Sequence, residues 1–364
     1  MANMNIATPR FYPDLISHLI SRGVTQNGEF DVTATGGSGA TATRGLQTGI
    51  ESELFDLNPL NQVSFDTGGD TDSQVLITLD LQDASYKQNY IAILNHNLNS
   101  ASGKIRVFAG DASSDVATVD AGAADTSDIS WGSVSTAEVV NADTITVASD
   151  NKDVTIEPAS DGTTIFTFNT QDLRYWAIQF EGATGGSGAD EDETWGSTDL
   201  LVGGIMIGQY YDMPYAPDLN VKRSIEYGAT KVQESLGGQR YATATSKGRT
   251  ASATSKSPFT LGTSSYDVHG GRLNYEMNFS YLRNTDVMPD EYHNADYDDS
   301  SFAGQVWNIT DGNLRPFIFS VDNGSTGASA ESEHIFARFD DNVLNTNHVA
   351  HNTYSMGLNL SEEF

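Results

Sequence analysis

Apolar and polar residues alternate along most of the chain, in short runs separated by turn-forming residues. In QVLITLDL, the side chains of Val75, Ile77 and Leu79 would share one face of a β-strand, because successive side chains of a strand point to opposite sides. Further strand-like runs occupy residues 89–98, 103–110, 163–170, 174–182 and 200–214. Short strands with Gly, Asn and Asp turns between them predict an all-β fold of β-sandwich-like domains.

One segment has the period of a helix instead. The stretch FYPDLISHLISR begins at Phe11, and the spacing of Phe11, Leu15 and Leu19 would place them on one stripe of an α-helix. Gly23 follows directly, and a glycine in this place commonly ends a helix. We therefore expect residues 1–49 to form a short N-terminal helix and a flexible, Gly-, Thr- and Ala-rich arm.

The pattern divides the rest of the chain into two β domains. Residues 50–213 form the first domain, and residues 111–165, which are rich in Asp, Ala, Ser and Thr, are interpreted as a partly β insertion within it. Residues 214–256 form a proline hinge and an extended segment, because proline fixes φ and disfavours helix in the preceding residue. Residues 257–364 form the C-terminal β domain.

The C-terminal domain is expected to consist of five strand units. In GRLNYEMNFSYL, residues 271–282, the alternation predicts one face made of Leu273, Tyr275, Met277, Phe279 and Tyr281. Four further strand-and-turn units are predicted at residues 305–312, 315–324, 334–342 and 351–364.

Charge and composition limit the kinds of molecule that this protein can bind. The 49 acidic residues exceed the 19 Lys and Arg residues and give a formal net charge of −30. Such a field repels nucleic acid and anionic membranes, so we expect no nucleic-acid partner. No apolar run approaches the ~20 residues of a membrane span, so no membrane insertion is expected. The chain has no cysteine, which excludes disulfides, thiolate metal sites and cysteine nucleophiles.

One segment reverses this charge. It follows Pro214 and Pro217, spans residues 222–256, and contains seven basic and two acidic residues, which gives it +5 and leaves −35 for the rest. The candidate interface residues in it are Lys222, Arg223, Lys231, Arg240, Lys247 and Arg249. One interpretation is a contact strip for the acidic face of a neighbouring copy, because opposite charge steers association. The other is a solvated loop that is basic by chance.

Candidates for metal binding and catalysis are weak. Acidic clusters at Asp66, Asp70 and Asp72, at residues 190–193 and at residues 290–301 could bind Ca²⁺, although none has the spacing of an EF-hand and solvated turns are the alternative. There is no H-E-x-x-H, G-x-S-x-G or P-loop motif. We therefore expect no enzymatic activity and no cofactor. We expect His96 to be a turn residue that hydrogen-bonds to the backbone, and His348 and His351 to lie in a loop or strand.

Two resemblances give these features a context. QVLITLDLQDASYKQNYIAILNHNL, KIRVFAG, YWAIQFEG and LLVGGIMIGQYYDMP, in this order, resemble a discoidin-like (galactose-binding-like) β-sandwich over residues 50–213. The whole chain resembles virion structural proteins of tailed phages and related viruses. The residues that carry this second likeness are YYDMPYAPDLNVKRSIEYG, ESLGGQRY, NYEMNFSYL, VWNITDGNLRPFIFSVD and ARFDDN.

The second resemblance implies a non-enzymatic structural protein of the virion, in the tail or tail tip, that is assembled in the host cytoplasm. Its expected partners are other copies of itself and other virion proteins. The alternative is a host-attachment protein that binds a surface glycan, with loop aromatics such as Trp131 and Trp195 stacking on sugar rings. In that alternative Tyr210, Tyr211 and Tyr215 could also contact sugars, whereas the first interpretation has them pack the two domains together.

Overall fold

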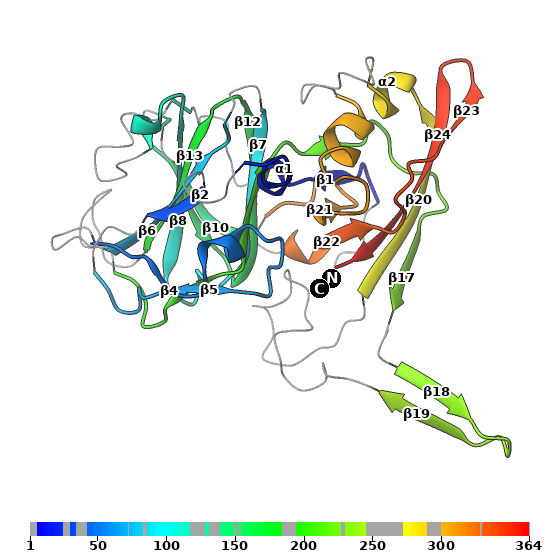
Figure 1. Cartoon of the computed structure of the whole chain (residues 1–364), viewed down its shortest axis with the longest axis horizontal. Coiled ribbons are helices and arrows are strands. Elements are labelled where there is room, and N and C mark those ends of the chain that lie inside the picture. Colours follow the sequence, from blue (N-terminus) through cyan, green and yellow to red (C-terminus); the bar gives the residue numbers. More distant parts are fainter. Residues whose placement is uncertain are drawn as a thin grey trace.

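The computed structural model describes most of the chain. The described residues are 6–24, 30–33, 42–71, 73–82, 86–116, 128–129, 131, 139–148, 151–152, 154–183, 194–226, 230–244, 272–289, 300–327 and 330–363. Strands dominate, and the helices are short, so the predicted all-β class with a short N-terminal helix is confirmed. Three sheets lie against one another in a stack, which we call the outer, middle and C-terminal sheets (Figure 1).

The outer and middle sheets form the first β-sandwich. The outer sheet has the order β10 (Ala142–Val147), β11 (Val154–Pro158), β8 (Gly103–Gly110), β13 (Tyr175–Gly182), β6 (Ser73–Asp80) and β2 (Phe30–Thr33), with β3 (Ala42–Thr43) beside β6. The middle sheet has the order β15 (Gly204–Gly208), β7 (Gln88–His96), β12 (Gly162–Gln171) and β9 (Val139–Val140). A smaller sheet joins β14 (Leu200–Val202), β5 (Val63–Phe65) and β4 (Leu46–Thr48).

Strand alternation explains why the middle sheet is buried on both sides. On β7, Ile91 and Ile93 belong to the core shared with the outer sheet, whereas Tyr90, Ala92 and Leu94 point to the other side. That second side packs against Tyr12, Ile318 and Phe336 of the C-terminal sheet. The two halves of the chain are therefore joined by a buried, mostly apolar contact between sheets.

The C-terminal sheet has eight strands. Its order is β16 (Tyr211–Asp212), β1 (Arg10–Tyr12), β21 (Phe317–Ser320), β22 (His334–Phe339), β24 (Thr353–Glu362), β20 (Arg272–Leu282) and β17 (Lys222–Glu226), with β23 (Thr346–Ala350) paired to β24. Its second face carries an aromatic core that includes Phe11, Phe302, Phe317 and Phe339. The π-helix η7 (Ala303–Trp307) and the short helix α2 (Asn284–Val287) contribute to this core.

The N-terminal segment differs from its prediction. Phe11 was predicted in the helix but lies in β1, in the interior of the C-terminal sheet. Part of the predicted flexible arm is also β structure, because β2 pairs with β6 and β4 pairs with β5. Helix α1 (Leu15–Ser21) starts only after Asp14, whose side chain caps it by accepting hydrogen bonds from the backbone N–H groups of Ile16 and Ser17. Gly23 follows the helix end with φ of 97°, as its position predicted.

The interpretation of residues 111–165 as an insertion is wrong for its second half. Strand β11 pairs with β8 in the outer sheet, and the start of β12 pairs with β7 in the middle sheet. The β character of this stretch was predicted, but Val154 and Ile156 are fully buried in the core of the first β-sandwich, so the strand belongs to the domain. Residues 117–127 and 132–138 of this segment lie outside the described residues.

Two details of the C-terminal half also differ. Residues 305–312 were predicted as a strand and turn, but the structure has a π-helix there, because Phe302 and Val306 pack side by side into the aromatic core. On β20, the pairing with β24 shifts between Phe279 and Leu282, so that Leu282 is buried and Tyr281 is 76 % exposed. A β-bulge of this kind reverses the alternation that the sequence predicted. The rest of this 11-residue strand, up to Phe279, follows the predicted period.

Adjacent glycines before and at the start of β15 give a test of this packing. A Cβ at Gly203 would lie 2.1 Å from the backbone oxygen of Pro59, whereas the nearest atom to a Cβ at Gly204 is 3.6 Å away. We expect Gly203→Ala to lower the free energy of unfolding by about 1–3 kcal/mol, because a backbone atom cannot rotate away. Gly204→Ala is the matched control and should cost less. Urea unfolding followed by circular dichroism measures both, and equal losses would contradict the packing.

Candidate functional site

The basic segment begins on the outermost strand of the C-terminal sheet. Strand β17 pairs with β20 on one side, and all five of its residues are exposed. Lys222 forms an ion pair with Glu276 across the strands at 3.3 Å, and Arg223 lies opposite Tyr275. Burial raises the pKa of the Tyr275 hydroxyl, and a hydrogen bond from Arg223 opposes that rise. These contacts hold β17 on the sheet, and no described strand pairs with its outer edge.

The segment continues into a hairpin that stands apart from the stacked sheets (Figure 1). Strands β18 (Thr230–Glu234) and β19 (Arg240–Ala244) pair only with one another in the described part of the chain. The connecting loop turns at Gly238, whose φ of 81° suits glycine, and the Gly238 N–H donates to the Ser235 carbonyl at 2.8 Å. The ion pair between Arg240 and Glu234, at 3.2 Å, closes the loop end.

The hairpin exposes apolar side chains, and none of its described side chains belongs to a buried cluster. Val232 is 64 % exposed, Tyr241 is 55 % exposed, and Leu236 at the tip is fully exposed. Because Gln233 pairs with Tyr241, Val232 and Tyr241 lie on opposite faces, so both faces carry apolar surface. An isolated two-stranded hairpin is only marginally stable in water. A structure of this kind is typical of an element that becomes buried against a partner.

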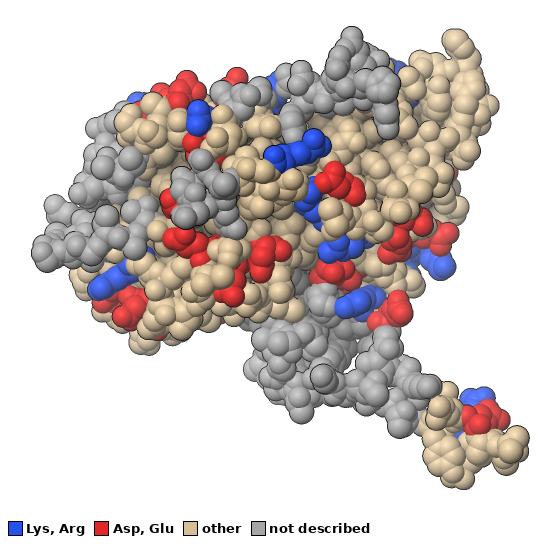
Figure 2. Space-filling view, viewed as in Figure 1, with Lys and Arg blue, Asp and Glu red and all other residues tan. Residues whose placement is uncertain are grey.

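The structure divides the predicted interface residues between two places. Lys222 and Arg223 lie on the sheet edge, whereas Lys231 and Arg240 lie on the hairpin strands, and Figure 2 shows the hairpin well separated from the body. The sequence predicted one extended strip, and the strands and turn replace it with an edge and a projecting arm. Lys247 and Arg249 lie outside the described residues.

The aromatic residues of the glycan-binding alternative are placed in the core. Trp131 and Trp195 are 0 % and 2 % exposed, and the Trp195 indole N–H donates to the Ser73 carbonyl at 2.8 Å. Neither indole is available to stack on a sugar, so this assignment is wrong. Tyr210 packs against the cluster between the middle and C-terminal sheets, and Tyr211 packs in the aromatic core of the C-terminal half, where its hydroxyl donates to the Asp286 carbonyl at 3.0 Å. Both follow the first interpretation, whereas Tyr215 is 43 % exposed.

The acidic clusters are described only in part. Asp70 forms an ion pair with Arg44 at 2.5 Å. Within the described ranges, no group of three or more His, Asp and Glu residues is placed to hold a metal ion. Asp72 and residues 190–193 and 290–299 lie outside those ranges, so Ca²⁺ binding there stays a prediction.

A polar network between the sheets was not anticipated from the sequence. The Arg10 guanidinium donates two hydrogen bonds to the Asp212 carboxylate, at 2.6 and 2.8 Å, and lies 3.9 Å from the centre of the Tyr210 ring. These contacts join β1 to β16 and to the segment before it. Beside them, burial raises the pKa of Tyr12 to about 12, an effect that the neighbouring Arg10 opposes. Arg10 in TPRFYP has no local pattern that marks it as buried.

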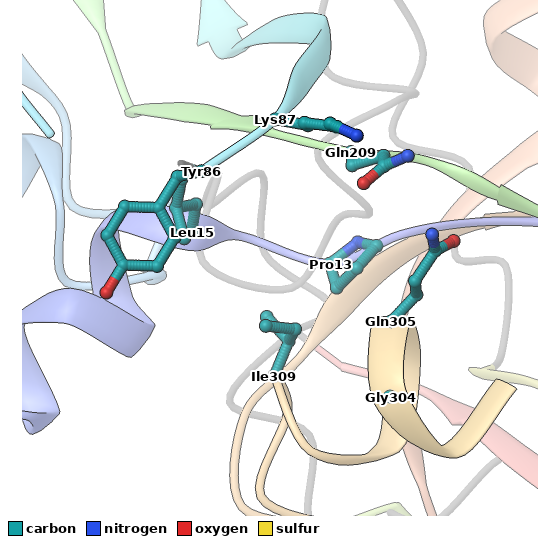
Figure 3. Close-up of a pocket in the computed structure, with 8 residues that line it drawn as sticks. All are labelled: Pro13, Leu15, Tyr86, Lys87, Gln209, Gly304, Gln305 and Ile309. Atoms are coloured by element: carbon teal, nitrogen blue, oxygen red, sulfur yellow. The ribbon is translucent and has the colours of Figure 1, made fainter. Parts of the chain in front are cut away.

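A small pocket opens where α1 and η7 approach one another (Figure 3). Its lining residues are Pro13, Leu15, Tyr86, Lys87, Gln209, Gly304, Gln305 and Ile309. It offers about 20 Å³ of space, which is room for about one water molecule and far less than a small-molecule site requires. The hairpin and the edge of β17 are therefore the stronger candidates for a functional surface.

The described helices include none that is both long and apolar enough to cross a membrane. Comparison of the chain with protein-family models, with curated proteins and with solved structures gives no match.

Proposed function

We propose that this chain is a non-enzymatic structural component of a tailed virus particle, in its tail or tail tip, that binds its neighbours through the β18–β19 hairpin. The observation that carries the proposal is the hairpin itself, which extends from the body with Val232, Leu236 and Tyr241 exposed. Such an arm gains stability when a neighbouring protein buries it. The resemblance to virion proteins supplies the setting.

Charge supports a protein partner for this arm. The segment of residues 222–256 carries +5 and the remaining residues carry −35, so an acidic neighbour, including another copy, would attract it. In Figure 1 the strands of the hairpin project away from the stacked sheets, so the arm can reach a neighbouring protein. We therefore favour a contact with a neighbouring protein over a solvated loop as the role of the basic segment.

The test uses tailed particles purified from cells that produce them together with this chain, quantified by mass spectrometry. We expect a fixed copy number per particle for the wild-type chain. Lys231→Glu combined with Arg240→Glu should reduce incorporation about tenfold or more, which corresponds to ~1.4 kcal/mol of lost binding free energy. Arg283→Glu reverses an exposed charge outside the segment and is the matched control.

Two outcomes would contradict the proposal in different ways. A chain that is absent from purified particles is not a virion component. A charge-reversed hairpin that is incorporated as well as the Arg283→Glu control does not bind through these charges. Circular dichroism of each purified variant shows that the sheets are intact, because both hairpin positions lie away from the core.

A further inference from the structure

The open edge of β17 is a second surface, distinct from the hairpin. β17 ends its sheet, and no strand of the described chain pairs with its outer side (Figure 1). An edge strand presents backbone N–H and C=O groups to any strand that can lie beside it. Ile225 is 56 % exposed there, although its cross-strand partner Leu273 packs against the aromatic core.

We propose that β17 pairs with β17 of a second copy, antiparallel, about a two-fold axis at Ser224. The axis of such a pair is perpendicular to the sheet and keeps every residue on its own face. The axis must therefore pass beside one residue. An axis between two residues would place side chains from opposite faces of the sheet across from one another. The axis that pairs the whole of Lys222–Glu226 is the one at Ser224.

The charges of the strand match this axis. In KRSIE, Lys222 of one copy lies opposite Glu226 of the other, and the same pair recurs at the other end. Arg223 lies opposite Ile225, where its aliphatic stem covers exposed apolar surface. An axis at Arg223 would bring two guanidinium groups together, and an axis at Ile225 would leave the Lys–Glu pairs unmade. Oppositely charged cross-strand pairs stabilise an antiparallel ladder, and like charges destabilise it.

Charged residues on an edge often protect a sheet from pairing, and lysine is the usual choice. That protection depends on like charges meeting when two copies approach. On β17 the charges at the two ends have opposite signs, so the strand attracts its own copy in one register and disfavours shifted registers. The proposal goes beyond the hairpin function, and either one can fail without the other, because the contacts involve different strands.

A disulfide test is clean because the chain contains no cysteine. At the axis, the two Ser224 Cα atoms would be about 4.5–5.5 Å apart, within the range that a disulfide spans. Ser224→Cys, oxidised at micromolar concentration, should form a covalent dimer on a non-reducing gel. Ile225→Cys is the control on the same exposed strand; its two copies would be about 8 Å apart, beyond that range. Equal cross-linking of both variants would overturn the proposed axis.

Charge exchange tests the pairing in the cysteine-free protein. Lys222→Glu or Glu226→Lys alone places like charges at both ends and should raise the dimer dissociation constant about tenfold or more in sedimentation equilibrium. The double variant restores opposite pairs between copies, and its dissociation constant should return to within about threefold of wild type. Single variants that dimerise like wild type, or a double variant that stays monomeric, would overturn the proposal.

Discussion

Phe11→Ala is expected to lower the free energy of unfolding by about 3–5 kcal/mol, the cost of emptying a fully buried aromatic site. The Phe11 ring is 0 % exposed and lies 5.1 to 5.7 Å from the rings of Phe302, Phe317 and Phe319. Its strand β1 connects β16 to β21, so a cavity there weakens the middle of the C-terminal sheet. A folded domain is stable by only ~5–15 kcal/mol, so this loss is a large fraction.

Urea unfolding followed by circular dichroism measures this effect. The midpoint should fall, and the slope with urea should stay unchanged, because the surface exposed on unfolding hardly differs. Tyr281→Ala is the control: it removes an aromatic ring that is 76 % exposed on β20 and should change the free energy by less than ~0.5 kcal/mol. If Phe11→Ala lowered the free energy of unfolding by less than about 1 kcal/mol, the proposed role of β1 would be contradicted.

Phe11 also shows where prediction from the sequence ends. Its spacing to Leu15 and Leu19 fits a helix, but Pro13 and the capping Asp14 start the helix after it. The partners of β1 are about 200 and 300 residues away, on β16 and β21. No local pattern reports such pairing. By contrast, β6, β8 and β13 were located closely from their alternating apolar residues, and β7 was located from a short continuous apolar run, which is typical of a strand buried on both faces.

The candidate site divides in the same way. The charge of residues 222–256 was visible in the sequence, because seven basic residues stand out in an acidic chain. Their separation into an edge strand and a hairpin was not, since it depends on β17 pairing with β20, about 50 residues later. Composition misled in one place: Trp131, in an Asp- and Ser-rich stretch, packs against Phe168 at 5.1 Å in the core.

Acid should destabilise this protein well before its carboxylates are neutralised, because three histidines are buried in the neutral form. Burial lowers the pKa of His96 to about 3 and the pKa values of His18 and His334 to about 4. The Leu98 N–H donates to His96 Nδ1 at 3.3 Å, so His96 Nε2 carries the proton and donates to the Thr164 hydroxyl at 2.8 Å. His96 thus bonds to the backbone as predicted.

The direction in which pH changes the stability follows from the difference between the folded and unfolded pKa values. An unfolded histidine titrates near 6.5, so the stabilisation is complete above that pH and is lost as the pH falls towards the folded values. Lowering the pKa of a histidine from 6.5 to about 4 corresponds to about 3 kcal/mol of stability, and lowering it to about 3 corresponds to about 5 kcal/mol. Asp14 acts in the opposite direction, because burial raises its pKa from 3.8 to about 6; its contribution is present below pH 3.8 and is lost as the pH rises through 6. It offsets about one histidine, so the net effect of acid is destabilising.

The experiment measures the free energy of unfolding at pH steps between 6 and 4.5. Within this window each buried histidine adds about 1.4 kcal/mol per pH unit to the slope. His96→Asn retains an acceptor for the Leu98 N–H and removes the titrating ring, so it should lower stability at neutral pH and reduce the slope by that amount. His351→Asn alters an exposed turn and should leave the slope unchanged. The slope compares one variant with itself across pH, so it separates the effect of protonation from the loss of packing. An unchanged slope in His96→Asn would mean that His96 takes up its proton in the folded protein as readily as in the unfolded chain.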